Sequence, residues 1–171
     1  VIWHHTVLVY DSAGKKLKIF LDGKKAGETP AISAISTGEA KLSIGADYEG
    51  MSDFLDGSVD EVAGYRKAVP DADVLEEASQ YEVLSLRLLN DRQIEARRRQ
   101  FLVAYWDFDI GSGNIVRDSS GSNNHGTLKN MDVNSWKEAF IGTCPLFDGT
   151  DDSMVVNHSP SLDFRRGFTI S

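Results

Sequence analysis

The richest supply of oxygen ligands in this sequence is the polar stretch from Asp118 to Gly126, which reads "DSSGSNNHG". Calcium binds about six to eight oxygens from carboxylates, amide side chains and carbonyls, and loops provide these readily. A plain turn is the alternative, in which Asp118, Asn123 and Asn124 bond to the local backbone and glycines supply the unusual dihedral angles. The residues alone leave both interpretations open.

Acidic residues are numerous enough to raise the question of glycoside hydrolysis, which needs two carboxyl groups facing each other across a cleft. On a strand, this favours a run of acids two and four residues apart, as in the pattern "ExDxxE". In "DGSVDEVAGY", Asp60 and Glu61 are adjacent and therefore point to opposite faces. Neither a nucleophile elbow nor a glycine-rich phosphate loop ahead of a helix is recognisable. The sequence therefore predicts no enzyme activity.

Aromatic rings can stack on sugars, so each of the three tryptophans is a candidate. Trp3 and Trp106 lie inside apolar runs, which predicts core positions for both. Trp136 lies in the polar stretch "NMDVNSWKEAF" and is the better candidate for an exposed platform in a ligand site. His4 and His5 are adjacent on an expected strand and cannot serve one metal ion from the same face.

Short strand-like runs predict the elements that must position these residues. In residues 1–66, "TVLVYD" and "KLKIFLDG" read as strands of a hairpin, followed by the turn signal Asp22-Gly23. The first strand is expected from Trp3 to Tyr10, and "AKLSIGAD" and "GSVDEVAGYRKAV", residues 57–69, are expected as two more strands. The start of residues 71–100, "DADVLEEASQYEVLSLRLL", lacks turn signals and places apolar residues at helical spacing, with Pro70 and Asp71 as a helix start. Two helices, or one kinked helix, are expected in 71–100, with a break near Asn90. Residues 101–171 return to strands, which together predict an antiparallel β-sandwich.

Composition sets limits on the class of protein. The 171 residues are 41% hydrophobic and 26% charged, which are globular values, and the net charge is −8. The one basic run, Arg97 to Arg99, is too short for the positive surface of a nucleic-acid binder. Cys144 is the only cysteine, so neither an internal disulfide nor a Cys-based zinc site is possible. We find no run approaching the ~18 apolar residues of a membrane span.

Several of these motifs, taken together, resemble a laminin-G-like, concanavalin-A-like jelly-roll domain. "WHHTVLVYDSAGKKLKIFLDGKKAG", "LSIGAD" and "FLDGSVDEVAGYRKAVPDADV" look like the second half of such a domain. "LVAYWDFDIGSGNIVRDSSGSNNHGTL", "LFDGTDDSMVVNHSPSLDF" and "FTIS" look like its first half. The halves come in reversed order. The resemblance therefore implies residues 1–70 as a C-terminal half, 71–100 as a helical connector and 101–171 as an N-terminal half.

This reversed order predicts a window across two tandem repeats, in which the sandwich is incomplete or circularly permuted. The two halves are expected to pack on each other within one chain, or to be exchanged between two chains. In either case the missing strands leave edges to pair, so we expect a homo-oligomer.

The resemblance implies a non-catalytic binding or adhesion module of a larger secreted protein, with a carbohydrate or an extracellular protein as its ligand. Some related domains hold calcium, and the family's motifs fall here on Asp118, Asn123, Asn124, Asp60 and Glu61. These five are the expected calcium ligands. The alternatives are a polysaccharide-acting enzyme of the same fold, or a fragment without activity of its own. Fold-level resemblance alone does not decide among them.

Overall fold

The computed structural model describes residues 2–31, 41–47, 52–75, 100–132, 134–139, 141–164 and 167–171. Its residues fall into two compact units, each assembled from segments far apart in the sequence. Unit 1 comprises Val1–Thr37, Ala63–Val103 and Asp163–Ser171, and unit 2 comprises Gly38–Val62 and Ala104–Leu162. Both units therefore contain segments from the N-terminal and the C-terminal parts of the chain.

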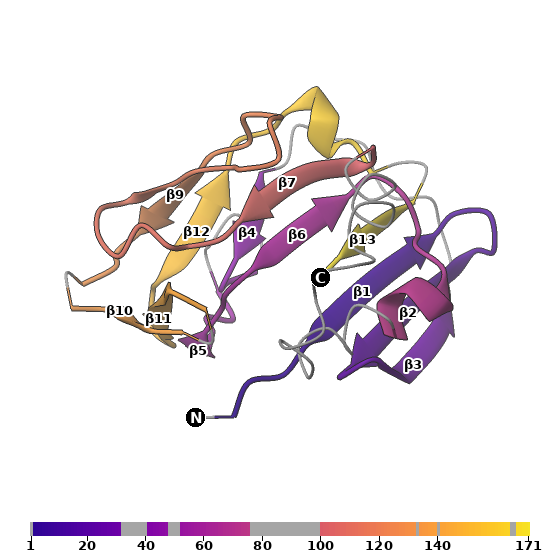
Figure 1. Ribbon diagram of the computed structural model, residues 1–171, viewed down its shortest axis with the longest axis horizontal. Coiled ribbons are helices and arrows are strands. Elements are labelled where there is room, and N and C mark those ends of the chain that lie inside the picture. Colours follow the sequence, from indigo (N-terminus) through magenta and orange to yellow (C-terminus); the bar gives the residue numbers. More distant parts are fainter. Residues whose placement is uncertain are drawn as a thin grey trace, which may run out of the picture. The chain divides into compact units, whose positions relative to one another are not determined.

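The strands of unit 1 belong to a six-stranded antiparallel sheet (Figure 1). The C-terminal strand lies between two strands from the N-terminal part of the chain, because Val9 pairs with Thr169 and Thr169 pairs with Tyr65. The order in the sheet is β3 (Lys24–Pro30), β2 (Lys16–Leu21), β1 (Thr6–Asp11), β13 (Phe168–Ile170), β6 (Val62–Tyr65) and β7 (Leu102–Trp106).

The hairpin turns follow from residue types that tolerate unusual backbone angles. Between β2 and β3, Asp22 and Gly23 both have positive φ, at 51° and 74°, which is the two-residue turn that Asp-Gly favours. Between β1 and β2, the Asp11 carboxylate accepts hydrogen bonds from the amides of Ala13 and Gly14 at 3.0 and 2.9 Å. The expected hairpin is confirmed.

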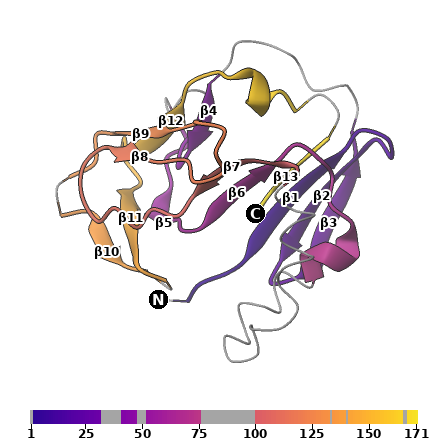
Figure 2. The same cartoon turned by 45° about the horizontal axis from the view of Figure 1, so that its top comes forward.

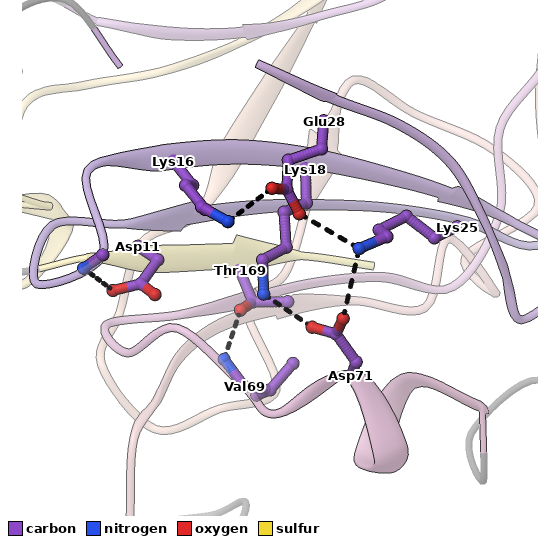
Figure 3. A network of polar contacts seen from close by, with 9 residues as sticks. Asp11, Lys16, Lys18, Lys25, Glu28, Val69, Asp71 and Thr169 are labelled. Carbon is purple, nitrogen blue, oxygen red and sulfur yellow. Dashed lines mark hydrogen bonds and ion pairs between the residues drawn. The ribbon is translucent and has the colours of Figure 1, made fainter. Parts of the chain in front are cut away.

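Residues 66–75 cover one face of the hairpin. Residues 71–75 are helical, and Val74 is fully buried in a cluster with Val7, Val9 and Phe20. An ion pair joins this segment to the hairpin, because Nζ of Lys18 lies 2.6 Å from the Asp71 carboxylate (Figure 3).

A buried threonine makes the second tie between this segment and the sheet. The Thr169 hydroxyl accepts a hydrogen bond from the Val69 amide at 3.0 Å and donates one to the Lys67 carbonyl at 2.9 Å. Figure 3 shows the bond from the Val69 amide beside the Lys18–Asp71 ion pair.

Unit 2 contains two smaller sheets (Figures 1 and 2). One has the order β10 (Trp136–Glu138), β11 (Thr143–Asp148) and β5 (Asp56–Ser58). The other has the order β4 (Leu42–Ile44), β12 (Ser153–Val156), β9 (Gly126–Lys129) and β8 (Ile115–Val116). A 3-10 turn, η2 (Pro160–Leu162), follows β12. The largest fully buried side chains of this unit are Trp106, Phe108, Phe147 and Met154.

The predicted mostly-β fold with antiparallel sheets is confirmed, and it is consistent with a β-sandwich of the jelly-roll type. The described residues include a helix only at 71–75, so most of the predicted connector 71–100 lies outside them. None of the described helical residues forms a segment long and apolar enough to cross a membrane. Circular permutation and the boundaries at residues 70 and 100 stay predictions.

Two strand boundaries differ from those expected. The first strand begins at Thr6 instead of Trp3. The His5 carbonyl still accepts the Asp22 amide, but the His5 amide bonds to the Asp22 carboxylate at 3.0 Å, outside the backbone ladder. The stretch expected as one strand at 57–69 is divided into β5 and β6, separated at Glu61, whose φ is +55°. A positive φ interrupts the extended backbone, which explains the break.

Candidate functional site

The Asp118 loop is built around a buried carboxylate that binds the backbone. Asp118 Oδ1 accepts hydrogen bonds from the amides of Tyr105 at 2.9 Å and Ser120 at 2.8 Å, and Oδ2 accepts one from Asn124 at 2.9 Å. Burial alone would raise the pKa of Asp118, but these hydrogen bonds outweigh it and the pKa is lowered. Asp118 is therefore an ionised group that closes its own loop.

The two asparagines of this loop differ in their surroundings. Asn123 is exposed and has φ +60°, a backbone conformation that asparagine tolerates. Asn124 is 3% exposed, its side-chain amide bonds to the Ser161 hydroxyl, and its carbonyl accepts the indole N–H of Trp106 at 2.9 Å. These two Asn124 contacts reach residues distant in sequence and are not the local backbone bonds expected of a plain turn. Trp106, 1% exposed, lies in the core as expected.

Asp60 and Glu61 lie elsewhere in unit 2. Glu61 accepts a hydrogen bond from the Tyr105 hydroxyl. Both carboxyl oxygens of Asp60 are buried, and no well-formed hydrogen bond from a described residue reaches them. Burial, reinforced by the charges of Glu61 and Asp109, raises the pKa of Asp60 to about 7. The surroundings of the two buried oxygens therefore favour the protonated form of the Asp60 carboxyl group up to near neutral pH.

Trp136 is half-buried and begins the edge strand β10, opposite Pro145 of β11. Opposite residues in an antiparallel pair share a face of the sheet, and Pro145 is buried. Part of the indole surface of Trp136 stays accessible, so the predicted platform is smaller than a fully exposed ring would give.

The only group of three potential metal-binding side chains among the described His, Cys, Asp and Glu residues is Asp148, Asp151 and Asp152. One oxygen from each carboxylate lies within 4.8 Å of the others. Asp60, Glu61 and Asp118 form no such group, so the carboxylates predicted as calcium ligands are not brought together in this way. Their assignment as ligands stays a prediction.

The hairpin between β11 and β12 positions these carboxylates. Asp148 Oδ1 accepts the amide of Thr150 at 2.8 Å, and Asp152 Oδ2 accepts the amide of Asp148 at 3.1 Å. Gly149, at φ +73°, packs so closely on Asp56 that an added Cβ would lie 2.9 Å from the Asp56 Cβ. The tight turn thus needs a glycine here, and it brings residues three and four positions apart onto one side.

The cluster differs from the Asp118 loop in how accessible it is. Asp148 and Asp151 are exposed, whereas Asp152 is only 3% exposed. Burial is the main cause that raises the pKa of Asp152, and the charges of Asp148, Asp151 and Asp132 add to it. Two carboxylates facing solvent beside a buried one form a site where a cation would relieve repulsion.

The sequence signal for this cluster is the run "FDGTDDS", in which a glycine turn separates Asp148 from Asp151 and Asp152. The resemblance identified the run as a strand motif, without assigning ligands to it. Spacing alone could not show that the turn folds the three carboxylates together.

In the described residues, the fold and this site define a mostly-β protein of antiparallel sheets with an acidic cluster at a hairpin tip. Residues 2–75 match the family model Laminin_G_3, described as the concanavalin A-like lectin/glucanases superfamily, and this confirms the resemblance over that segment. The same comparison does not extend the match to residues 101–171, where the resemblance stays a prediction. No curated protein and no solved structure matched the chain.

Proposed function

We propose that this chain is part of a non-catalytic, extracellular binding module that recognises a carbohydrate or a protein with support from calcium. The superfamily matched by residues 2–75 supports a module of either the binding or the glucanase type. The observation that favours calcium-supported binding is the convergence of Asp148, Asp151 and Asp152 within 4.8 Å. Their oxygens are the hard, anionic ligands that calcium prefers.

The donor set fits a calcium ion in its chemistry. Hydrogen bonds engage one oxygen of Asp148 and one of Asp152, and each carboxylate has further lone pairs to offer. The Asp151 side chain takes part in none of these bonds. When bound, calcium would supply positive charge to hold ligand hydroxyls or carboxylates at the hairpin tip. The chain itself supplies the rigid turn that holds the three carboxylates.

Trp136 lies on the same strand pair as this cluster. It is opposite Pro145, three residues before Asp148 on β11, so about 10 Å of strand separates the two positions. The amide of Ser135, the residue before Trp136, donates to the carbonyl of Asp132, whose charge acts on Asp152. Because successive side chains of a strand alternate, Asp148 points to the opposite face of the sheet from Pro145 and Trp136, so the ring and a cation at the cluster would contact different surfaces of a ligand.

The experiment is thermal melting of chelator-treated protein during a calcium titration. Calcium at about 100 times its dissociation constant should stabilise the fold by about 2.7 kcal/mol. For a chain of this size, that corresponds to a rise of roughly 5–10 °C. Asp151→Asn should lose most of this rise without losing basal stability, because the side chain is exposed. Asp53→Asn, another exposed aspartate of unit 2, is the matched control and should keep the full rise.

A calcium-independent melting temperature in the wild type would contradict the calcium part of the proposal. Equal shifts in wild type and Asp151→Asn would place the ion elsewhere, for example at the five residues expected from sequence. Magnesium at the same concentration serves as a second control, because it demands a tighter octahedral geometry than an exposed hairpin provides.

The glucanase alternative would need an acid with a raised pKa that a substrate can reach. Asp60 has the raised pKa, but its oxygens are buried. This burial favours binding over hydrolysis. Incubation with soluble β-glucans and analysis of their chain length tests the alternative directly, and shortened products would support it.

A further inference from the structure

The sequence contains one Asn-X-Ser/Thr acceptor pattern, Asn157-His158-Ser159. This pattern marks asparagines that receive an N-linked oligosaccharide in chains passing through a secretory compartment, and such sites lie on surface loops. None of the other asparagines has serine or threonine two residues further on. The structural context of Asn157 decides whether the pattern is accessible.

Asn157 directly follows β12, whose last residue Val156 is paired with both Gly126 of β9 and Leu42 of β4. Val156 is 1% exposed, whereas Asn157 and His158 are exposed. The ladder therefore ends at Val156 and the chain turns outward at the acceptor. No hydrogen bond to a described residue occupies the Asn157 side chain, in contrast to Asn130 and Asn134, whose side-chain amides bond to Asp151 and Asp132.

We propose that Asn157 is an N-glycosylation site. The amide nitrogen of Asn157 forms a C–N bond to the anomeric carbon of a lipid-pyrophosphate-linked oligosaccharide. The C–O bond to the pyrophosphate breaks, the lipid pyrophosphate leaves with the electron pair, and the amide proton passes to a base of the transferase. This inference depends on the extracellular location in the proposed function.

The hydroxyl of the acceptor pattern is engaged in the folded chain. Ser159 Oγ lies 2.8 Å from Ser161 Oγ, and the Ser159 carbonyl accepts the Leu162 amide at 2.9 Å as η2 begins. A transferase that must contact the Ser159 hydroxyl therefore competes with this turn. The sugar is expected to be added to the nascent chain, before residues 159–162 close.

A glycan at Asn157 would leave the acidic cluster accessible. Asn157 and Asp152 flank opposite ends of β12, and five residues of extended chain span about 16 Å. Calcium-induced stabilisation should therefore be the same in the glycosylated chain and in Asn157→Gln. Glycosylation is measured by mass and calcium binding by melting temperature, so a failure of one proposal can be told from a failure of the other.

The test is translation of the chain behind a secretory signal peptide in the presence of eukaryotic microsomes, followed by mass measurement with and without a glycan-releasing amidase. The wild type should carry a single glycan that the amidase removes. Asn157→Gln and Ser159→Ala should carry none, and Ser159→Thr should be glycosylated. Asn134→Gln, outside the pattern, should be glycosylated as the wild type is.

Microsomes report on the nascent chain, so a variant that folds poorly still gives an answer. An unmodified wild type inside the microsomes would overturn the proposal, and so would a glycan that persists in Asn157→Gln. Equal glycan occupancy in the nascent chain and in refolded protein given the transferase would overturn the inferred order of addition.

Discussion

Asp60→Asn should stabilise the protein at pH 8 and leave its stability nearly unchanged at pH 4. The carboxyl group of Asp60 is buried without a well-formed hydrogen bond, between the charges of Glu61 and Asp109. Its pKa is raised from 3.8 to about 7 in the folded protein. At pH 4 the folded protein holds Asp60 neutral, as an asparagine is. At pH 8 the wild type buries a charge that the variant lacks.

The sign follows from proton binding. Between pH 4 and pH 7 the folded state keeps a proton on Asp60 that the unfolded state has lost, so the stability that this group contributes falls as pH rises. A shift of roughly three pKa units limits the loss of unfolding free energy from ionised Asp60 to about 4 kcal/mol. Because Asp60 is incompletely buried, solvent screening reduces this, and we expect a gain of about 1–2 kcal/mol for the variant above pH 7.

Urea unfolding of both proteins at pH 4, 6 and 8 measures this difference. The wild type and variant should have similar midpoints at pH 4 and diverge as the pH rises. Asp53→Asn makes the same chemical change at an exposed position and should show no comparable divergence. A variant that is destabilised at every pH would refute the reasoning, because it would mean that the Asp60 carboxylate makes a favourable contact, for instance with a metal ion.

Three further substitutions test particular contacts by the same unfolding measurement. Thr169→Val keeps the side-chain shape but removes the hydroxyl that bonds to Val69 and Lys67, so the free energy of unfolding should fall by about 1–3 kcal/mol. An unchanged free energy of unfolding would mean that these two bonds do not stabilise the fold. Gly126→Ala places a Cβ 2.7 Å from Cγ of the buried Met154 and should lower the free energy of unfolding by about 1–3 kcal/mol. An unchanged free energy of unfolding would show that Met154 can move aside. Asp118→Ala leaves three backbone amides without their acceptor and should lower the free energy of unfolding by about 2–4 kcal/mol. The loss should be the same in calcium and in chelator. A loss seen only in calcium would mean that Asp118 is a calcium ligand.

Much of the fold could be predicted because the signals are local. The period-2 pattern of residues 16–21 marks a strand and Asp22-Gly23 marks the turn, so the hairpin is encoded within a short stretch. The pattern does not give the buried face, because Phe20 is buried whereas Ile19 and Leu21 are each 43% exposed. The break at Glu61 could not be predicted, because residues 57–69 read as one continuous strand. A positive φ at a glutamate depends on surrounding contacts, such as its hydrogen bond from Tyr105.

The candidate site was harder to predict than the fold. The Asp118 loop was identified as rich in oxygen ligands, but composition could not show that the Asp118 oxygens accept backbone amides. Spacing likewise could not show that the carboxyl oxygens of Asp60 are buried while Asp148 and Asp151 stay exposed. Burial depends on residues distant in sequence, and burial decides which carboxylates can meet a cation.

The most direct test of the proposed function is retention on a panel of immobilised glycans and matrix proteins, with mass analysis of the recovered glycans. We expect retention on at least one ligand in calcium, release by chelator, weakened retention for Asp151→Asn, and glycans of unchanged chain length. Retention that chelator leaves unchanged would contradict the role of calcium. Shortened glycans would contradict the central claim of binding without catalysis.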